Sequence, residues 1–321
     1  MQIFTASPES PAQEKLFVWK RAGDLCALDL RGYETRNPSV LKLIALAEQT
    51  SELPAFGPLL VHTGDRPINT GDPTWHSLAF SSAVGFFDTA VPDFLFDGWP
   101  QVGLGDYEDA ARSAAAAGML EPETMRLGWI GNCDTHPSRW RLHELGAAHP
   151  DLLDVHHITW VPNADGSPMA TLAGNQLSLE DQVRRWGLLI DIEGNGWSAR
   201  LKLLLHSGRP VFIQERPWRE WFWPQLRPME HYIPVQRDLS DLCDRVRWAL
   251  DHADEAGAIG QAGQRFAQSE LTREAAARAW SRTLTELTWR PAPHYGPPEW
   301  RQLLDPVFAQ LGVQTSATVA S

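Results

Sequence analysis

The sequence predicts an α/β protein of two domains, with a parallel sheet in the second domain. A length of 321 residues favours two domains over one large core. Residues 186–214 have the pattern of a strand, a glycine-rich turn, a short helix and another strand, which is typical of a right-handed βαβ unit in a parallel sheet. A new strand, loop and helix begin near residue 124, and we expect the domain boundary there.

The composition excludes several classes of protein. Charged residues make up 21% and hydrophobic residues 43%, which is ordinary for a globular chain. The formal net charge of -12 argues against a nucleic-acid partner, although a local basic patch could hold a phosphate. Cys26, Cys133 and Cys243 lie far apart, so neither a thiolate zinc site nor a disulfide framework is expected.

The N-terminus has no basic stretch followed by an apolar one, and no apolar run approaches the ~20 residues that span a bilayer. We therefore expect a cytoplasmic protein without an integral membrane segment, and peripheral contact with the inner membrane remains open. The 15 tryptophans fit core packing, but aromatic faces also suit sugar rings. Composition does not separate these two interpretations.

The first domain, expected over residues 1–124, begins with a hairpin. Apolar residues 16–20 and 25–30 flank the turn Ala22-Gly23-Asp24, which predicts two paired strands. The other elements expected here are a helix over 38–49, with apolar residues at helical spacing, a buried strand over 58–62, and an alanine-rich helix over 106–117.

The second domain is expected over residues 125–270. In its βαβ unit, Ser198 is the predicted N-cap of the helix and Gly208 its end. The segment 271–321 is expected to form a helix and a tail that pack back on the first domain. The strands expected here are 125–130, 155–160, 188–192 and 211–213, and helices are expected from His136 onward and over 239–252, 256–268 and 274–287.

The glycine-rich turn 193–197 is the first chemical feature. It opens a helix, whose N-terminal N–H groups attract anions, and it follows a parallel strand, where ligands of such sheets bind. Arg200 lies in the first turn of that helix, where a cation opposes the helix dipole. A bound phosphate would explain Arg200, and so would a tight turn followed by a surface arginine. The sequence has neither a Walker loop nor a GxGxxG turn.

Four stretches, in order along the chain, carry a family resemblance. They are Asp191 to Phe212, Trp218 to Leu226, Pro228 to Val235, and Asp238 to Leu242. Together they resemble the signature of the protein O-glucosyltransferase and capsule-associated glycosyltransferase family, glycosyltransferase family ninety, in a bacterial-type cytoplasmic form. Looser similarity extends back towards Gly85.

The resemblance implies GT-B architecture, in which two Rossmann-like domains face each other across a cleft. It also implies inverting transfer from a UDP-sugar co-substrate, with no metal and no other cofactor. Ser198 and Arg200 would hold the donor pyrophosphate with the adjacent backbone amides. Glu220 would contact the ribose, or lie on a solvated helix face. The turn residues included in the expected donor site are Gly194, Asn195, Gly196 and Trp197.

Two further segments belong to the expected donor site. His231 and Tyr232 precede the loop that closes the nucleotide pocket in the family, or they pack beneath it. The family also carries an Arg-Gly-Ser element after the first strand of the second domain. Gly131 matches its glycine, but Ile130 replaces the arginine and Asn132 the serine, so phosphate binding by this loop stays open. Arg139 matches the family's following arginine and is the better candidate for donor contact.

An inverting transfer needs one carboxylate that takes the proton of the acceptor hydroxyl. Asp88 follows an apolar segment, and by resemblance Asp88 and Pro92 match the family's Asp-x-x-x-Pro element, which holds the catalytic aspartate. The alternative is an aspartate that caps a turn, and Asp93 is a nearby competitor. His156 and His157 are neighbours on a strand and face opposite ways, so we expect them to be structural and not to share a metal.

Three functions remain in view. The first is the glycosyltransferase, with a glycan, lipopolysaccharide precursor or protein as acceptor. The second is a glycoside hydrolase, which needs two carboxylates at a set separation and no phosphate site. The third is a non-catalytic nucleotide-sugar-binding protein. The sequence leaves the sugar, the acceptor and the oligomeric state open.

Overall fold

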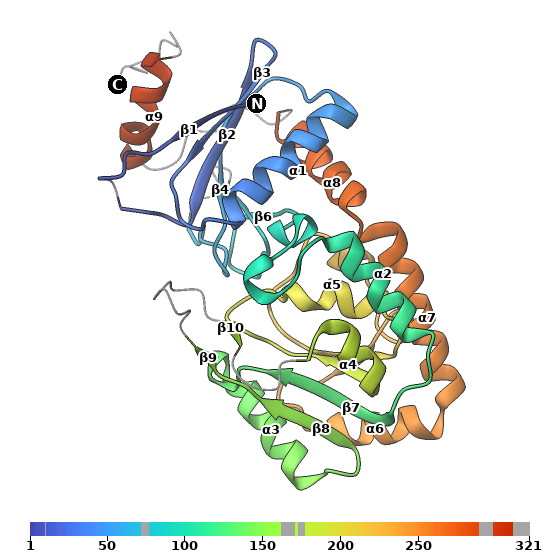
Figure 1. Ribbon diagram of the computed structural model, residues 1–321. Coiled ribbons are helices and arrows are strands. Elements are labelled where there is room, and N and C mark those ends of the chain that lie inside the picture. Colours follow the sequence, from blue (N-terminus) through green and yellow to red (C-terminus); the bar gives the residue numbers. More distant parts are fainter. Residues whose placement is uncertain (10, 72–76, 162–170, 173–176, 289–297, 311–321) are drawn as a thin grey trace. The chain divides into compact units, whose positions relative to one another are not determined.

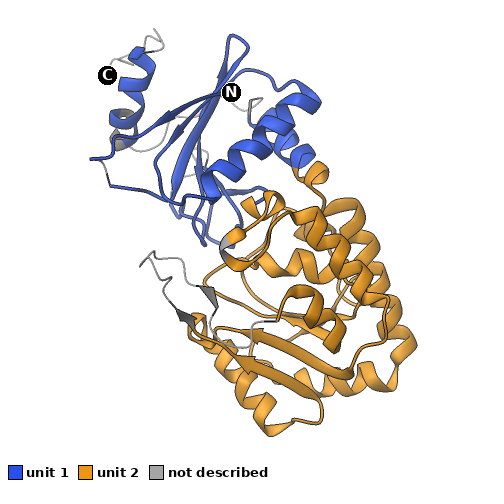
Figure 2. Cartoon of the chain, viewed as in Figure 1, with its two compact units in different colours: residues 1–93, 277–321 blue, residues 94–276 orange. Residues whose placement is uncertain are grey.

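The structure, a computed structural model, describes residues 1–9, 11–71, 77–161, 171–172, 177–288 and 298–310 (Figure 1). The chain forms two compact units (Figure 2). Unit 1 comprises residues 1–93 and 277–321, and unit 2 comprises residues 94–276. Each unit has its own sheet.

The boundary between the units comes before helix α2 (Tyr107–Gly118), not after it. The boundary that we expected near residue 124 therefore lies inside unit 2. The reason is the packing of α2 on α5 (Ala199–His206). Gly118 lies so close to that region that an added Cβ would be 1.6 Å from the carbonyl oxygen of Ser207. The alanine-rich sequence predicts the helix but not the neighbour on which it packs.

Unit 1 is built on a six-stranded mixed sheet of order β1-β3-β2-β4-β5-β6. The predicted hairpin is confirmed: β2 and β3 pair antiparallel, and Ala22 and Gly23 in their turn both have positive φ. β4 runs antiparallel to β2 and parallel to β5. The strands are β1 (Gln2–Thr5), β2 (Lys15–Arg21), β3 (Asp24–Asp29), β4 (Phe56–His62), β5 (Ser77–Ala79) and β6 (Thr89–Ala90).

Two helices of unit 1 lie on opposite sides of this sheet, α1 (Arg36–Ser51) and α9 (Pro298–Gln310) (Figure 1). The apolar stripe of α1 is buried, as its spacing predicts. α9 packs on the other face, where the Trp300 ring lies 5.6 Å from that of Phe17. The C-terminal segment thus shares a core with the N-terminal strands.

Unit 2 contains a five-stranded parallel sheet of order β13-β12-β11-β7-β8. The predicted βαβ unit forms as β11, α5 and β12, and Gly208 ends the helix with a φ of +73°. β7 and β11 are neighbours, and the sheet grows outward from each of them in opposite directions. Their carboxyl ends are therefore the switch point where open parallel sheets bind ligands. The strands are β7 (Thr124–Gly131), β8 (Leu153–His157), β11 (Trp186–Asp191), β12 (Val211–Gln214) and β13 (Ile233–Val235).

The remaining elements of unit 2 complete its layers. A short antiparallel pair, β9 with β10, follows β8. The helices predicted after β13 form within a few residues of their expected ends. Among the residues described, no helix combines the length and the apolar character needed to cross a bilayer. The elements are α3 (Pro137–Ala148), β9 (Trp160–Val161), β10 (Thr171–Leu172), α4 (Leu179–Arg185), α6 (Leu242–Asp251), α7 (Ala253–Glu270) and α8 (Arg273–Thr288), the last of which continues into unit 1.

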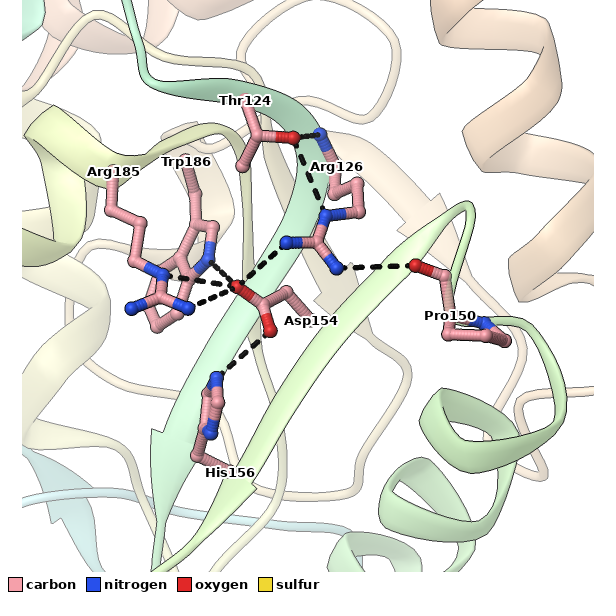
Figure 3. Close-up of polar contacts among 7 residues, drawn as sticks. All are labelled: Thr124, Arg126, Pro150, Asp154, His156, Arg185 and Trp186. Atoms are coloured by element: carbon pink, nitrogen blue, oxygen red, sulfur yellow. Dashed lines mark hydrogen bonds and ion pairs between the residues drawn. The ribbon is translucent and has the colours of Figure 1, made fainter.

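One buried carboxylate, Asp154, ties the edge strand β8 to its neighbours (Figure 3). Its Oδ2 accepts hydrogen bonds from the Trp186 indole at 2.8 Å and from Arg185 at 3.0 Å. Arg126 lies 3.4 Å from the same oxygen, and His156 Nε2 lies 2.8 Å from Oδ1. Burial alone would raise the pKa of Asp154, but the Trp186 hydrogen bond and the three basic side chains lower it below its ordinary value. The carboxylate is therefore held in its charged form.

Candidate active site

The candidate site lies in unit 2, at the carboxyl ends of β7 and β11. Three segments meet there: the loop after β7, the glycine-rich turn after β11, and the loop after β12. The interior below them is apolar, with Trp129, Ile190 and Phe212 in one buried cluster. Asp191 and Glu193, which lie above this core, are buried, so each needs a partner in the protein or in a ligand.

Arg139, in the first turn of α3, joins the first two of these segments. Its Nε donates to the carbonyl oxygen of Glu193 at 2.9 Å, and its Nη1 donates to that of Asn132 at 3.0 Å. Burial, and next the charge of Arg200, lower its pKa to about 10. The guanidinium also explains Gly194, because a Cβ there would lie 2.8 Å from Arg139 Nη2.

Arg200, in the first turn of α5, is the second cation of the site. Its guanidinium lies 5.8 Å from the centre of the Trp129 ring, and that of Arg139 lies 5.5 Å from the same ring. Among the described residues Arg200 has no hydrogen bond and no ion pair. Burial lowers its pKa, and the charge of Asp191 opposes that effect. Two guanidinium groups close together repel each other, so an anion between them would stabilise the site.

Asp191, at the end of β11, holds two side chains in place. Its Oδ1 accepts a hydrogen bond from the Ser198 hydroxyl at 2.5 Å, and its Oδ2 lies 2.5 Å from Arg216 Nη2. Ser198 occupies the predicted N-cap position, but its side chain caps no backbone N–H. The predicted N-cap bond is absent because the Ser198 hydroxyl donates its hydrogen bond to the Asp191 carboxylate instead. The first N–H groups of α5 stay available for an anion.

Glu220 lies in a buried ion pair and not on a solvated helix face. Its Oε1 is 2.5 Å from Lys202 Nζ, and the two side chains are 2% and 0% exposed. Lys202 also lies 4.7 Å from the centre of the Trp197 ring. The predicted ribose contact of Glu220 is untested, and this burial opposes it.

His231 and Tyr232 lie in the loop that ends at the start of β13, and both make contacts within unit 2. The His231 ring stacks on Phe266 at 5.0 Å, and its Nδ1 accepts a hydrogen bond from the Arg227 N–H. Tyr232 is 8% exposed. Burial raises its pKa, and Arg219 and Arg216 act against that rise. A direct contact of these two residues with the donor stays a prediction.

The remaining predicted donor residues shape the two loops. Asn132 accepts a hydrogen bond from the Asp134 N–H through its Oδ1, so its side chain caps the short turn after β7. Gly131 is packed closely, because a Cβ there would lie 2.7 Å from the Trp129 ring. In the glycine-rich turn Gly196 and Trp197 are buried and Asn195 is exposed.

Asp88, the predicted base, lies in unit 1 just before β6 and is 5% exposed. Its Oδ2 accepts hydrogen bonds from the N–H groups of Ile68 at 3.0 Å and Asn69 at 2.7 Å. Its Oδ1 accepts one from the Ser77 hydroxyl at 2.7 Å. These three bonds hold the loop after β4 against β5. Asp93, the competitor, is 1% exposed and so is buried more completely.

Asp65 is a second carboxylate in unit 1, and the sequence reasoning missed it. It follows the carboxyl end of β4, and its side chain is 37% exposed. Its Oδ1 lies 3.0 Å from Nη1 of Arg36, which also donates to the Thr63 carbonyl oxygen. The signal that could have found it is its position directly after a buried strand. Asp65 can meet a hydroxyl from solvent more readily than Asp88 can.

The two adjacent histidines face opposite ways, as predicted. His156 meets Asp154, whereas His157 Nδ1 accepts a hydrogen bond from the Cys133 N–H at 3.1 Å. In the described part of the chain no group of three or more His, Cys, Asp or Glu side chains could hold a metal ion. Both histidines are accounted for by contacts within the protein.

Three charged residues of unit 2 also escaped the sequence reasoning: Glu193, Lys202 and Arg216. Each is buried, with at most 3% exposure. Their common signal is position, because each follows a parallel strand or lies in the helix that opens there. Lys202 and Arg216 are paired with buried carboxylates, whereas one oxygen of Glu193 has no hydrogen-bond partner among the described residues.

Comparison with known proteins gives the chain a family. A profile described as "Glycosyl transferase family 90" matches residues 58–289. Protein O-glucosyltransferase 1 of Rattus norvegicus is 30% identical over 231 residues, which are 67% of this chain and 57% of the relative. The Homo sapiens protein of that name is 29% identical over the same shares. Protein O-glucosyltransferase 2 of Danio rerio is 42% identical over 82 residues, 26% of this chain and 16% of the relative. The chain thus spans little more than half the length of the first two relatives.

Solved structures give weaker likenesses. Anabaena Alr3699/HepE in complex with UDP-glucose has a TM-score of 0.34 at 9% identity, over 55% of this chain and 44% of that one. A glycosyltransferase from Rickettsia africae ESF-5 has a TM-score of 0.33 at 11% identity, over 78% and 53%. Scores of this size carry no argument about this protein. The sequence match, by contrast, extends over both units and every segment of the site in unit 2. The chain therefore belongs to glycosyl transferase family 90.

Proposed function

We propose that this protein is an inverting glycosyltransferase that moves a hexose or a pentose from a UDP-sugar to a hydroxyl group. The acceptor is a glycan, a lipopolysaccharide precursor or a protein. Family membership supports glycosyl transfer, and the names of the protein O-glucosyltransferase relatives support glucose as the sugar. We further propose the GT-B arrangement that the resemblance implies, and a cytoplasmic place of action that is peripheral to the inner membrane for a lipid-linked acceptor.

The observation that carries this proposal is the pair Arg139 and Arg200 beside the N-terminus of α5. Arg200 makes no hydrogen bond and no ion pair with a protein anion among the described residues, and its charge lowers the pKa of Arg139. A nucleoside diphosphate supplies the missing negative charge. It would also be the leaving group, so the same two guanidinium groups and the N–H groups of α5 would stabilise the charge that develops on it.

The proton acceptor in the proposed reaction is a carboxylate of unit 1. Resemblance assigns this role to Asp88, and that assignment stays a prediction. Three hydrogen bonds and 5% exposure suit Asp88 for holding the loop after β4. We propose Asp65 for the base, because a base must reach the acceptor hydroxyl and Asp65 is 37% exposed.

A screen of nucleotide sugars tests the proposal. The full chain is mixed with UDP, UDP-glucose, UDP-xylose and, as controls, ADP-glucose and GDP-mannose, and melting temperature and slow sugar release are measured. We expect UDP and at least one UDP-sugar to raise the melting temperature, and that sugar to be released slowly. No stabilisation by any uridine nucleotide would contradict the proposal. Stabilisation with no turnover, also in the presence of acceptors, would favour a non-catalytic nucleotide-sugar-binding protein.

A further inference from the structure

Three buried carboxylates surround the start of α5: Asp191, Glu193 and Glu220, with exposures of 2%, 3% and 3%. Two of them already have close cationic partners. Arg216 lies 2.5 Å from Asp191, and Lys202 lies 2.5 Å from Glu220. Glu193 differs from both, and the difference points to a ligand.

Glu193 is fixed in place at three of its four polar positions. Its N–H donates to Gln214 Oε1 at 2.8 Å, and its carbonyl oxygen accepts from Arg139 Nε at 2.9 Å. Its side-chain Oε1 accepts from the Trp218 indole N–H at 2.8 Å. The carboxylate therefore cannot turn freely to find another partner.

The other side-chain oxygen, Oε2, is buried and has no hydrogen-bond partner among the described residues. The Nε2 atom of His136 lies 3.8 Å from it, which is beyond a hydrogen bond. A buried carboxylate oxygen without a donor is costly in free energy. Such a group calls for a partner that the protein itself does not supply, and a bound ligand is one such partner.

The chemistry of the missing partner follows from the charge of Glu193. A carboxylate repels a phosphate, so the phosphates belong beside Arg139 and Arg200 and not at Oε2. A carboxylate accepts from neutral O–H donors, and pairs of neighbouring hydroxyl groups suit it best. In dinucleotide-binding sheets an acidic residue near a strand end binds a ribose in this way.

We infer that Glu193 binds a vicinal diol of the nucleotide-sugar donor through Oε2. The inference rests on the proposed function, and it names a residue that sets donor specificity. The diol belongs to the ribose or to the transferred sugar, and the chemistry is the same in both. Glu220, expected to contact the ribose, is instead held by Lys202.

The test compares three ligands on three proteins by calorimetry. The ligands are UDP, 2′-deoxy-UDP and UDP-glucose. The proteins are the parent chain, Glu193→Gln and the control Glu144→Gln. Glu144 is a suitable control because it lies in the same unit, in the second half of α3, and its side chain is 67% exposed. Melting temperatures of the free proteins show that each variant is folded.

We expect a ligand with the hydroxyl group that meets Glu193 to bind about tenfold more tightly, or more, than a ligand without it. This is the scale of a hydrogen bond to a charged group. If the diol is the ribose, the parent prefers UDP to 2′-deoxy-UDP and Glu193→Gln loses most of that preference. If it is the sugar, Glu193→Gln instead loses the parent's preference for UDP-glucose over UDP. The Glu144→Gln variant keeps both preferences.

Unchanged preferences in a folded Glu193→Gln protein would overturn the inference and leave the proposed function standing. A parent chain that binds none of the three ligands would overturn both. If Glu193→Gln does not fold, Glu193→Asp replaces it. The shorter side chain keeps the charge but draws the oxygen back, so the affected preference should fall, and full retention would again overturn the inference.

Discussion

The charged residues that the resemblance assigns to the site have different surroundings in the two units. In unit 1, Asp88 accepts three hydrogen bonds from nearby loops and a strand, so its bonding is complete without a ligand. In unit 2, Arg200 packs on Trp129 and has no anionic partner among the described residues, although Arg139 lies on the same ring. The resemblance assigns both Asp88 and Arg200 to the site. Their surroundings differ, because Asp88 has hydrogen-bond partners in the protein and Arg200 has none among the described residues.

A charged side chain without an ion-pair partner therefore identifies a binding residue better than burial or sequence position does. A satisfied buried charge serves the fold, and its loss lowers stability. A charge without a partner costs stability in the free protein and is repaid when a ligand binds.

The largest effect is expected on turnover, from Asp65→Asn. The substitution removes the proton acceptor and keeps the shape, so kcat should fall about a hundred- to ten-thousand-fold. UDP affinity should barely change, because the donor site lies in unit 2. Turnover, UDP affinity and melting temperature are measured on one preparation.

Asp88→Asn is the matched partner of that experiment. The amide oxygen can keep the two backbone N–H donors, but the amide NH2 must then donate to the Ser77 hydroxyl, and all three hydrogen bonds lose their charged acceptor. We expect about 1–3 kcal/mol less stability and nearly normal activity per folded molecule. The reverse result, stable but inactive Asp88→Asn beside active Asp65→Asn, would show that the resemblance names the base correctly.

The second effect concerns the buried pair of Lys202 and Glu220. Lys202→Met leaves a carboxylate buried without its partner and should cost about 3–5 kcal/mol in the free energy of unfolding. Adding Glu220→Leu should restore most of that loss, because two apolar side chains of similar volume replace the pair. Urea unfolding of the single and double variants measures both. Equal destabilisation by the double variant would mean that Glu220 has another essential task.

The third effect is on donor binding. Arg200→Ala should weaken UDP binding by about 1.5–3 kcal/mol, the scale of a charge-assisted hydrogen bond. Stability should stay the same or rise, since the repulsion from Arg139 disappears. Arg184→Ala, at an exposed surface position, serves as the control. Unaltered UDP affinity in Arg200→Ala would remove this residue from the site.

Most of the fold of unit 2 could be predicted because its signals are local. Apolar runs of strand length, the turn 193–197 and the stop at Gly208 each act within a few residues. The boundary of the units could not be predicted, since it depends on the close approach of Gly118 to Ser207. Residues far apart in the sequence make that contact, and an alanine-rich helix has no side-chain pattern to announce it.

The sequence predicts where the candidate site lies, but not which side chains in it bind each other. The sequence places Arg200, Ser198 and the glycine-rich turn at one strand end, and the structure agrees. It does not show that Ser198 donates to Asp191 or that Glu220 is held by Lys202. Such pairings depend on the register of β11 against β12 and on the path of the loop that follows. These pairings determine which charged groups remain available to bind a ligand.

The fourth effect is the acid dependence of stability at Asp154. Its pKa is lowered in the folded protein, so its contribution is present above the unfolded-state pKa and is lost as pH falls through the folded-state value. Asp154→Asn should cost about 1 kcal/mol at neutral pH, because its basic partners are partly exposed. The stability of the variant should change less between neutral and acid pH. Urea unfolding of both proteins over that range is the measurement, and parallel curves would contradict the assignment.

The smallest effect, none at all, is expected from removal of divalent ions. Arg139, Arg200 and the N–H groups that open α5 supply the positive charge that the two phosphates of a UDP leaving group need. Transfer should therefore proceed at the same rate in EDTA as without it. The measurement is the initial rate of transfer with and without EDTA, and then with added manganese or magnesium. Arg200→Ala provides a further test. If the arginines act in place of a metal, added magnesium should recover part of the rate lost in that variant and have little effect on the rate of the parent. A parent rate that disappears in EDTA and returns with the metal would show that the cationic site of unit 2 is not sufficient for the leaving group.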